Sequence, residues 1–205
     1  CKELAFDFWG ENKLIENFQS ILLVLSLFYS FLIIKKLKKK FFMYYFFIFF
    51  FIGIFYFLGE ELSWGQHLFK WESPDFFISH NNQNETNLHN MSNLLNEVPR
   101  YLVLLSCCFS IFFVLIFKKF FLNKKDIRFL IFPNPKLLII CISLIFFTIP
   151  DLVLSKFDLE IHFQRITFNF LRVSELQELI VTFYLFIYSS SIYECLKKKK
   201  YNFFF

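Results

Sequence analysis

Two short polar stretches contain most of the side chains in this sequence that could take part in chemistry. The first, GEELSWGQH at 59–67, directly follows a long apolar run. If it continues as a helix, Glu60, Trp64 and His67 share one face. A carboxylate and an imidazole so placed can share a proton or a metal ion. Two other interpretations stay open: a helix end with Trp64 in the membrane interface, or a structural network of polar groups.

The second stretch, NNQNETNLHN at 81–90, supplies His89 as a second candidate metal ligand. Its richness in Asn and Gln is typical of a solvated loop. A further pair of acids, Glu175 and Glu178, lies where a later apolar run begins. Acids suit the N-terminus of a helix, and these two could also contribute to a shared site.

The composition decides which elements must position these groups. Of 205 residues, 57% are hydrophobic and 36 are Phe, whereas Gly occurs only four times and Pro only five. An ordinary soluble domain is about 45–50% apolar and contains more Gly and Pro. Disorder, a collagen-like chain and a disulfide scaffold are excluded for the same reasons. The chain is therefore predicted to be an integral membrane protein.

A transmembrane helix needs about 20 mostly apolar residues. The sequence predicts a single all-α membrane domain, a polytopic bundle of about five such helices, at 14–34, 41–58, 101–117, 137–154 and 176–196. Strands are excluded because an open sheet edge cannot lie in lipid. The polar region 59–100 would lie on the outer face, with short interfacial helices expected over 71–80 and 88–101.

The charges support this arrangement. The three loops 35–40, 118–136 and 197–200 carry five, six and four of the 22 lysines and arginines, and few of the 17 acids. The positive-inside rule assigns this basic side to the cytoplasm, so the chain's N-terminus is predicted outside and its C-terminus inside, in a bacterial inner membrane. These lysines fit anionic lipid headgroups, so the predicted partner is the bilayer and not nucleic acid. Protein partners cannot be assigned from the sequence.

An outside N-terminus favours a missing initial helix before Cys1, which would make six helices with both ends inside; the alternatives are an acylated Cys1 and an arbitrary boundary of the chain. The other cysteines offer no CxxC pair and lie mostly inside apolar runs. They are interpreted as small apolar core residues.

The stretch GEELSWGQ at 59–66, then WESP at 71–74 and ETNLHN at 85–90, resembles a family of uncharacterised bacterial multi-pass inner-membrane proteins. That family carries GEE(I/L)SWGQ and NLHN motifs, so the resemblance implies a membrane bundle and the location of a site, but no reaction. Where the family has Arg after SWGQ, this chain has His67. This difference makes His67 a weaker candidate ligand than Glu60, Glu61 and His89.

The leading hypothesis is an acidic, outward-facing polar pocket that binds a small molecule, a lipid headgroup or a cation. Its candidate residues are Glu60, Glu61, Trp64, Gln66, Asn87, His89, Asn90, Glu175 and Glu178. The enzymatic alternative is a metal-assisted membrane hydrolase that uses Glu60 or Glu61 with His89. A transporter is less favoured, because Ser and Thr are the strongest polar residues within the predicted helices. No cofactor can be named from the sequence.

Overall fold

The computed structural model describes residues 14–37, 42–81, 85–88, 91–122, 137–156 and 173–197. Over these ranges the chain is all-α, with no strand. The long helices are α2 (Leu14–Lys36), α3 (Phe42–Glu61), α6 (Asn93–Leu122), α7 (Leu138–Lys156) and α9 (Val173–Lys197). Three short elements follow α3, namely η1 (Ser63–Gly65), α4 (Gln66–Phe69) and α5 (Asp75–His80).

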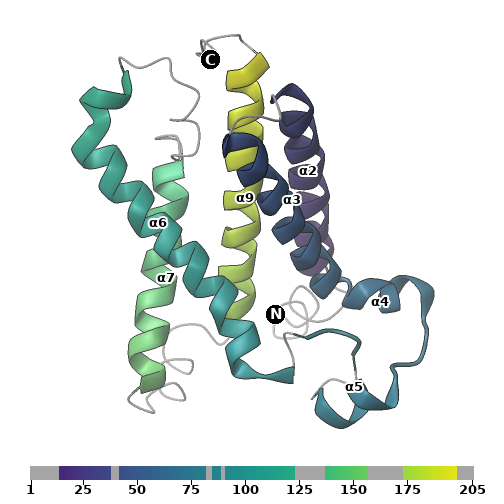
Figure 1. Cartoon of the computed structure of the whole chain (residues 1–205). Helices are drawn as coiled ribbons and strands as arrows, with labels where there is room; N and C mark the ends of the chain where they lie inside the picture. The colour runs from purple at the N-terminus through teal and green to yellow at the C-terminus, as the bar shows by residue number, and fades with distance from the viewer. Residues whose placement is uncertain are drawn as a thin grey trace.

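Helix α9 lies at the centre of the bundle (Figure 1). Helices α2 and α3 pack together on one side of it, and α6 and α7 pack together on the other. The buried apolar residues come from all five long helices, and they include Phe47 of α3, Cys107 of α6 and Leu144 of α7. The outer surfaces of these helices also carry many exposed large apolar side chains, as a lipid environment requires.

Within the ranges that the structure describes, three helices are long and apolar enough to cross a membrane: Leu14–Lys36, Phe42–Glu61 and Glu175–Lys197. The predictions at 14–34, 41–58 and 176–196 are therefore confirmed as candidate spans. Within α6 and α7 the apolar segments Tyr101–Ile116 and Leu138–Ile149 are shorter. Both predicted segments are helical, but their crossing of the membrane stays a prediction.

One detail of the prediction was wrong. Residues 93–100 do not form part of a separate interfacial helix, because α6 begins at Asn93 and runs through Pro99 without a break. Helix α7, predicted over 137–154, runs from Leu138 to Lys156 and also contains a proline, Pro150. A proline removes one backbone hydrogen bond, and helices in membrane bundles tolerate this where neighbouring groups compensate. The short helix predicted within 71–80 is present as α5.

Small polar residues allow α2 and α9 to approach closely. Ser26 and Ser30 of α2 are fully buried, and each hydroxyl donates to the carbonyl four residues earlier in its own helix. Thr182 and Ser189 of α9 are also fully buried and bond within their helix. Small residues at a helix interface favour backbone approach, and internal hydrogen bonding removes the cost of burying their hydroxyls.

The basic and motif-bearing ends of the bundle lie opposite each other. Helices α2 and α9 run in the same direction, because Gln19 bonds to the start of α9 and Lys36 lies over Tyr193 near its end. The ends of α2 and α9 lie at the top of Figure 1, whereas the end of α3 and helix α5 lie at the bottom. The lysines and the polar motif are thus separated by the length of the helices.

Candidate functional site

The backbone changes direction immediately after α3. Ser63, Trp64 and Gly65 have φ values of 45°, 54° and 96°, all in the left-handed region. Glycine adopts this region freely, whereas each of the other two residues costs about 1–2 kcal/mol there. The predicted continuation of the helix to His67 is therefore wrong, and Glu60, Trp64 and His67 do not share one helical face. The side chain of His67 lies outside the described residues.

The reversed backbone folds the Trp64 indole back onto α3. Its Nε1 donates a hydrogen bond of 2.8 Å to Oε1 of Glu60. The ring lies over Gly59, where an added Cβ would come within 2.9 Å of two ring carbons. It also meets the rings of Phe55 and Tyr56 edge-on, at centroid distances of 6.3 and 6.0 Å. Gly59 is thus needed for space, and Glu60 fixes the orientation of the indole.

Glu60 also connects the two polar stretches. Its side chain is only 3% exposed, and its Oε2 accepts a hydrogen bond of 2.7 Å from the backbone N–H of Leu88. The two oxygens of one carboxylate therefore hold Trp64 on one side and the ETNL segment on the other. Bonds to an ionised acceptor are stronger than neutral ones, which suits a contact that joins distant segments.

A second connection is formed by Ser63, Glu85 and Asn87. The Ser63 hydroxyl donates to Oε2 of Glu85 at 2.8 Å, and Nδ2 of Asn87 donates to the same oxygen at 2.6 Å. Asn87 Nδ2 also lies 3.1 Å from the Ser63 hydroxyl oxygen. Asn81 closes the turn, because its Nδ2 bonds to Oδ1 of Asn87 at 2.8 Å and to the Glu85 carbonyl at 2.8 Å. All four side chains are buried.

The carboxamide of Gln66 makes a third connection. Its Nε2 donates to the Ser73 hydroxyl at 2.9 Å, and its Oε1 accepts from the backbone N–H of Thr86 at 2.7 Å. The Ser73 and Thr86 hydroxyls lie 3.2 Å apart, and the Trp71 indole N–H lies 3.5 Å from the Thr86 hydroxyl oxygen. The WESP segment is thereby fixed between the other two.

We call this network the polar cap. Its side chains are those of Glu60, Ser63, Trp64, Gln66, Trp71, Ser73, Asn81, Glu85, Thr86 and Asn87. Four predicted site residues belong to it: Glu60, Trp64, Gln66 and Asn87. His89 and Asn90 lie outside the described residues. Glu61 is the last residue of α3 and is half-buried.

Glu175 and Glu178 lie in the first turns of α9 and are half-buried. There the fully buried Gln19 of α2 donates from Nε2 to the Glu175 carbonyl at 3.2 Å. Gln177, also buried, donates to the Phe147 carbonyl of α7 at 3.3 Å. This second polar group joins three helices at the same end of the bundle as the polar cap.

Sequence reasoning missed six members of the network: Ser63, Trp71, Ser73, Asn81, Glu85 and Thr86. The Asn-rich composition around Glu85 indicated a solvated loop, although the carboxylate is only 9% exposed. The sequence did contain a usable signal: short polar side chains occur at Ser63 and again over 81–87, the two stretches that the network joins. Composition does not distinguish a loop that bonds to water from one that bonds to itself.

The polar cap provides carboxylate, amide and hydroxyl oxygens held in fixed positions. Among the residues that the structure describes, no group of three His, Cys, Asp or Glu side chains is placed to hold a metal ion. The chemistry that these oxygens favour is acceptance of hydrogen bonds from a polar or positively charged group. No known protein family, curated protein or solved structure matches the chain.

Proposed function

We propose that this protein is a multi-pass inner-membrane binding protein, with five crossings and an outward-facing polar cap that binds a positively charged, hydrogen-bond-donating group. The three candidate spans support its place in the bilayer. The resemblance of the GEELSWGQ and NLHN stretches to a family of bacterial inner-membrane proteins supports the same assignment. An ammonium group of a lipid headgroup or of a small solute has the required chemistry.

The burial of two carboxylates in one network carries this proposal. Glu60 and Glu85 are 3% and 9% exposed, and Ser63 and Leu88 connect the segments that bear them. Removing two like charges from water is costly, and a nearby positive group lowers that cost. The cap also lies at the end of the bundle opposite the ends of α2 and α9 (Figure 1), whose last turns carry Lys36 and Lys197. A cationic ligand would therefore meet an acidic region.

The fixed geometry of the cap favours binding. Each of the three connections joins the end of α3, or the segment that follows it, to residues 85–88 through hydrogen bonds of 2.7–3.1 Å. A ligand would therefore not have to order the loop, and preorganisation of this kind increases affinity. The hydrolase alternative requires Glu60 or Glu61 to act with His89, which lies outside the described residues. Both Glu60 oxygens already accept protein hydrogen bonds, which argues against Glu60 as the metal ligand or base of a hydrolase.

The test is to reconstitute the protein in nanodiscs and measure its thermal unfolding. Phosphatidylethanolamine has a donating ammonium, whereas phosphatidylcholine has a positive charge without a donor. We expect ethanolamine lipid, or free ethanolamine added to phosphatidylcholine discs, to raise the melting temperature. Comparing ethanolamine lipid with free ethanolamine distinguishes binding of a lipid headgroup from binding of a soluble amine.

Glu85→Gln should abolish this stabilisation, while Glu72→Gln, which changes an exposed acid of the neighbouring WESP segment, should preserve it. Equal melting temperatures in all lipids, with and without ethanolamine, would overturn the proposal. Measuring the zinc content of the purified protein tests the hydrolase alternative. Zinc retained by the parent and lost in Glu61→Gln would favour the hydrolase instead.

A further inference from the structure

The segment that follows α3 carries large apolar side chains on its outside. We call residues 66–80 the arm; it contains α4 and α5. Its most exposed large side chains are between 41% and 75% exposed, and they are Phe69, Trp71, Phe76 and Ile78. Helix α5 has no buried residue. Exposed apolar groups in such a short segment mark a surface that contacts something other than water.

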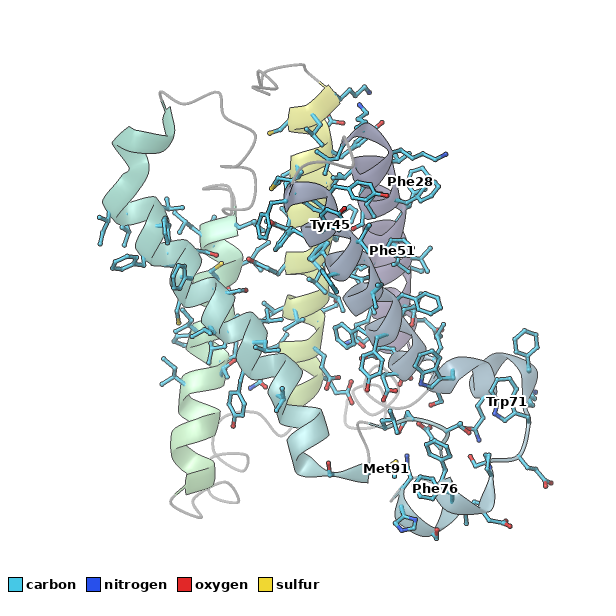
Figure 2. All side chains as sticks on the ribbon, viewed as in Figure 1. Phe28, Tyr45, Phe51, Trp71, Phe76 and Met91 are labelled. Carbon is cyan, nitrogen blue, oxygen red and sulfur yellow. The ribbon has the colours of Figure 1, made fainter. Side chains whose placement is uncertain are left out.

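The arm projects sideways from the bundle. It extends from the end of α3 on the side away from α9 (Figure 1), and Figure 2 shows Trp71 and Phe76 on this projecting part. It therefore lies beside the end of the helices, where lipid would surround α3. A segment that extended straight away from the membrane would not be in this position.

The length of α3 places the arm at the level of the lipid headgroups. Helix α3 has 20 residues and ends at Glu61. At 1.5 Å per residue it is about 30 Å long, which equals the thickness of the hydrocarbon core. Because Lys36 and Lys40 mark the opposite boundary just before α3, the residues after Glu61 begin at the outer boundary.

The aromatic surface is continuous from α3 to the arm. Exposed Phe55 and Tyr56 of α3 contact the ring of Trp64. A Cβ added to Gly65 would lie 3.3 Å from the Phe69 ring and 3.4 Å from the Trp71 ring. The Phe69 and Trp71 rings stack at 6.0 Å with an interplanar angle of 7°. The lipid-facing side of α3 thus leads directly onto the arm.

The polar parts of these residues are already satisfied by the protein. Trp64 donates its indole N–H to Glu60, and the Trp71 N–H faces the Thr86 hydroxyl. Both rings can therefore enter an apolar environment without leaving an unpaired donor. Exposed Lys70, Glu72 and Asp75 alternate with the aromatic residues and would stay among the headgroups.

We infer that the arm lies in the outer interface of the bilayer, with Phe69, Trp71 and Phe76 inserted among the headgroups and upper acyl chains. Aromatic residues are enriched at this level because their rings prefer the boundary between water and hydrocarbon. The polar cap holds the arm in this position through Gln66, Ser73 and Thr86. Insertion does not depend on which ligand the polar cap binds.

A photoreactive benzoylphenylalanine, introduced one site at a time into the full chain, tests the inference. The probe replaces Phe69 or Phe76 in the arm, Phe49 of α3 as a lipid-facing reference, or Glu72 as a polar control. After reconstitution in phosphatidylcholine vesicles and irradiation, mass spectrometry measures phospholipid adducts. We expect adducts at Phe69 and Phe76 comparable to those at Phe49 and roughly tenfold above those at Glu72.

Arm adducts no more abundant than those at Glu72 would overturn the inference, and so would adducts formed with a protein when intact cells are irradiated. A second measurement needs no new side chain. The fluorescence of Trp71 is the difference between the parent chain and the Trp71→Phe variant. Lipids brominated high on the acyl chain should quench it, and aqueous iodide should quench it only weakly. The opposite pattern of quenching would place Trp71 in water.

Discussion

Several residues of the GEELSWGQ stretch have distinct physical roles at the end of α3. Gly59 leaves space for the Trp64 ring, and Glu60 bonds to that ring and to Leu88. Ser63 bonds to Glu85, while Gly65 has a backbone conformation, φ 96°, that favours glycine. The pattern that could have indicated catalysis is thus explained largely by the demands of a tight, hydrogen-bonded turn.

Gly59→Ala should destabilise the protein by about 1–3 kcal/mol, because the new methyl group overlaps the held Trp64 ring. The measurement is thermal unfolding in detergent, followed by circular dichroism. Gly53→Ala is the matched control in the same helix, because a Cβ there meets nothing within 4 Å. Alanine favours a helix, so the control should be neutral or slightly stabilising. Equal behaviour of the two variants would contradict the placement of Trp64.

Asn87→Asp should destabilise the polar cap in a pH-dependent manner. Asn87 Nδ2 lies 2.6 Å from Oε2 of Glu85, so the substitution places two carboxylates in contact. We expect a loss of about 2 kcal/mol or more near neutral pH, with partial recovery at about pH 5, where one proton can be shared between them. Asn17→Asp, at an exposed position near the start of α2, controls for the chemical change. A pH-independent loss would argue against this contact.

At the scale of the elements, polar side chains join the helices at the polar-cap end of the bundle. Gln19 of α2 is fully buried between α2 and α9, where its Nε2 donates to the Glu175 carbonyl. Its Oε1 is buried without a hydrogen-bond partner in the part of the chain described by the structure. An unpaired buried acceptor costs about 1–3 kcal/mol, which offsets the bond made by the same carboxamide.

Gln19→Leu should therefore change stability by less than about 1 kcal/mol, because leucine fills the space and removes the unpaired oxygen together with the bond. Gln19→Ala removes the same polar groups but leaves a cavity, so it should cost about 1–3 kcal/mol more. Thermal unfolding of both variants in the same detergent makes the comparison. If leucine proves as costly as alanine, the carboxamide makes a stabilising polar interaction, such as one with a buried water.

At the scale of the whole molecule, the helix directions agree with five crossings. Helices α2, α6 and α9 run toward the lysine-rich end, whereas α3 and α7 run toward the polar cap (Figure 1). This alternation is what a chain that crosses the bilayer at every long helix requires. The arm and the polar cap share one end, so lipid insertion and ligand binding would occur at the same membrane surface.

Cysteine labelling tests the orientation. Glu72→Cys should react with a membrane-impermeant maleimide in intact spheroplasts, because the arm is predicted outside. Lys197→Cys, at the opposite end of the bundle, should react only after permeabilisation. The parent chain, which retains its own cysteines, gives the background. Labelling of both introduced cysteines from the same side would contradict the five-crossing topology.

Sequence reasoning predicted the helices accurately, because a run of about 20 apolar residues has few alternatives in a bilayer. The bounds of α2, α3 and α9 differ from the predicted ones by at most three residues at either end. The candidate site was harder to predict from the sequence. Residues 59–67 appeared continuous with α3 because neither Ser63 nor Trp64 is a residue type that predicts a left-handed backbone.

The amino-acid sequence by itself predicted a helical membrane bundle with lysines and acids separated between its two ends. Hydropathy and charge belong to each residue and do not depend on how the chain folds, so they can be read along the sequence. Only the tertiary structure decided that Glu60 joins Trp64 to Leu88 and that Ser63, Glu85 and Asn87 form one network. Hydrogen bonds between residues 22 to 28 positions apart depend on how the turn folds back, and composition does not encode that geometry.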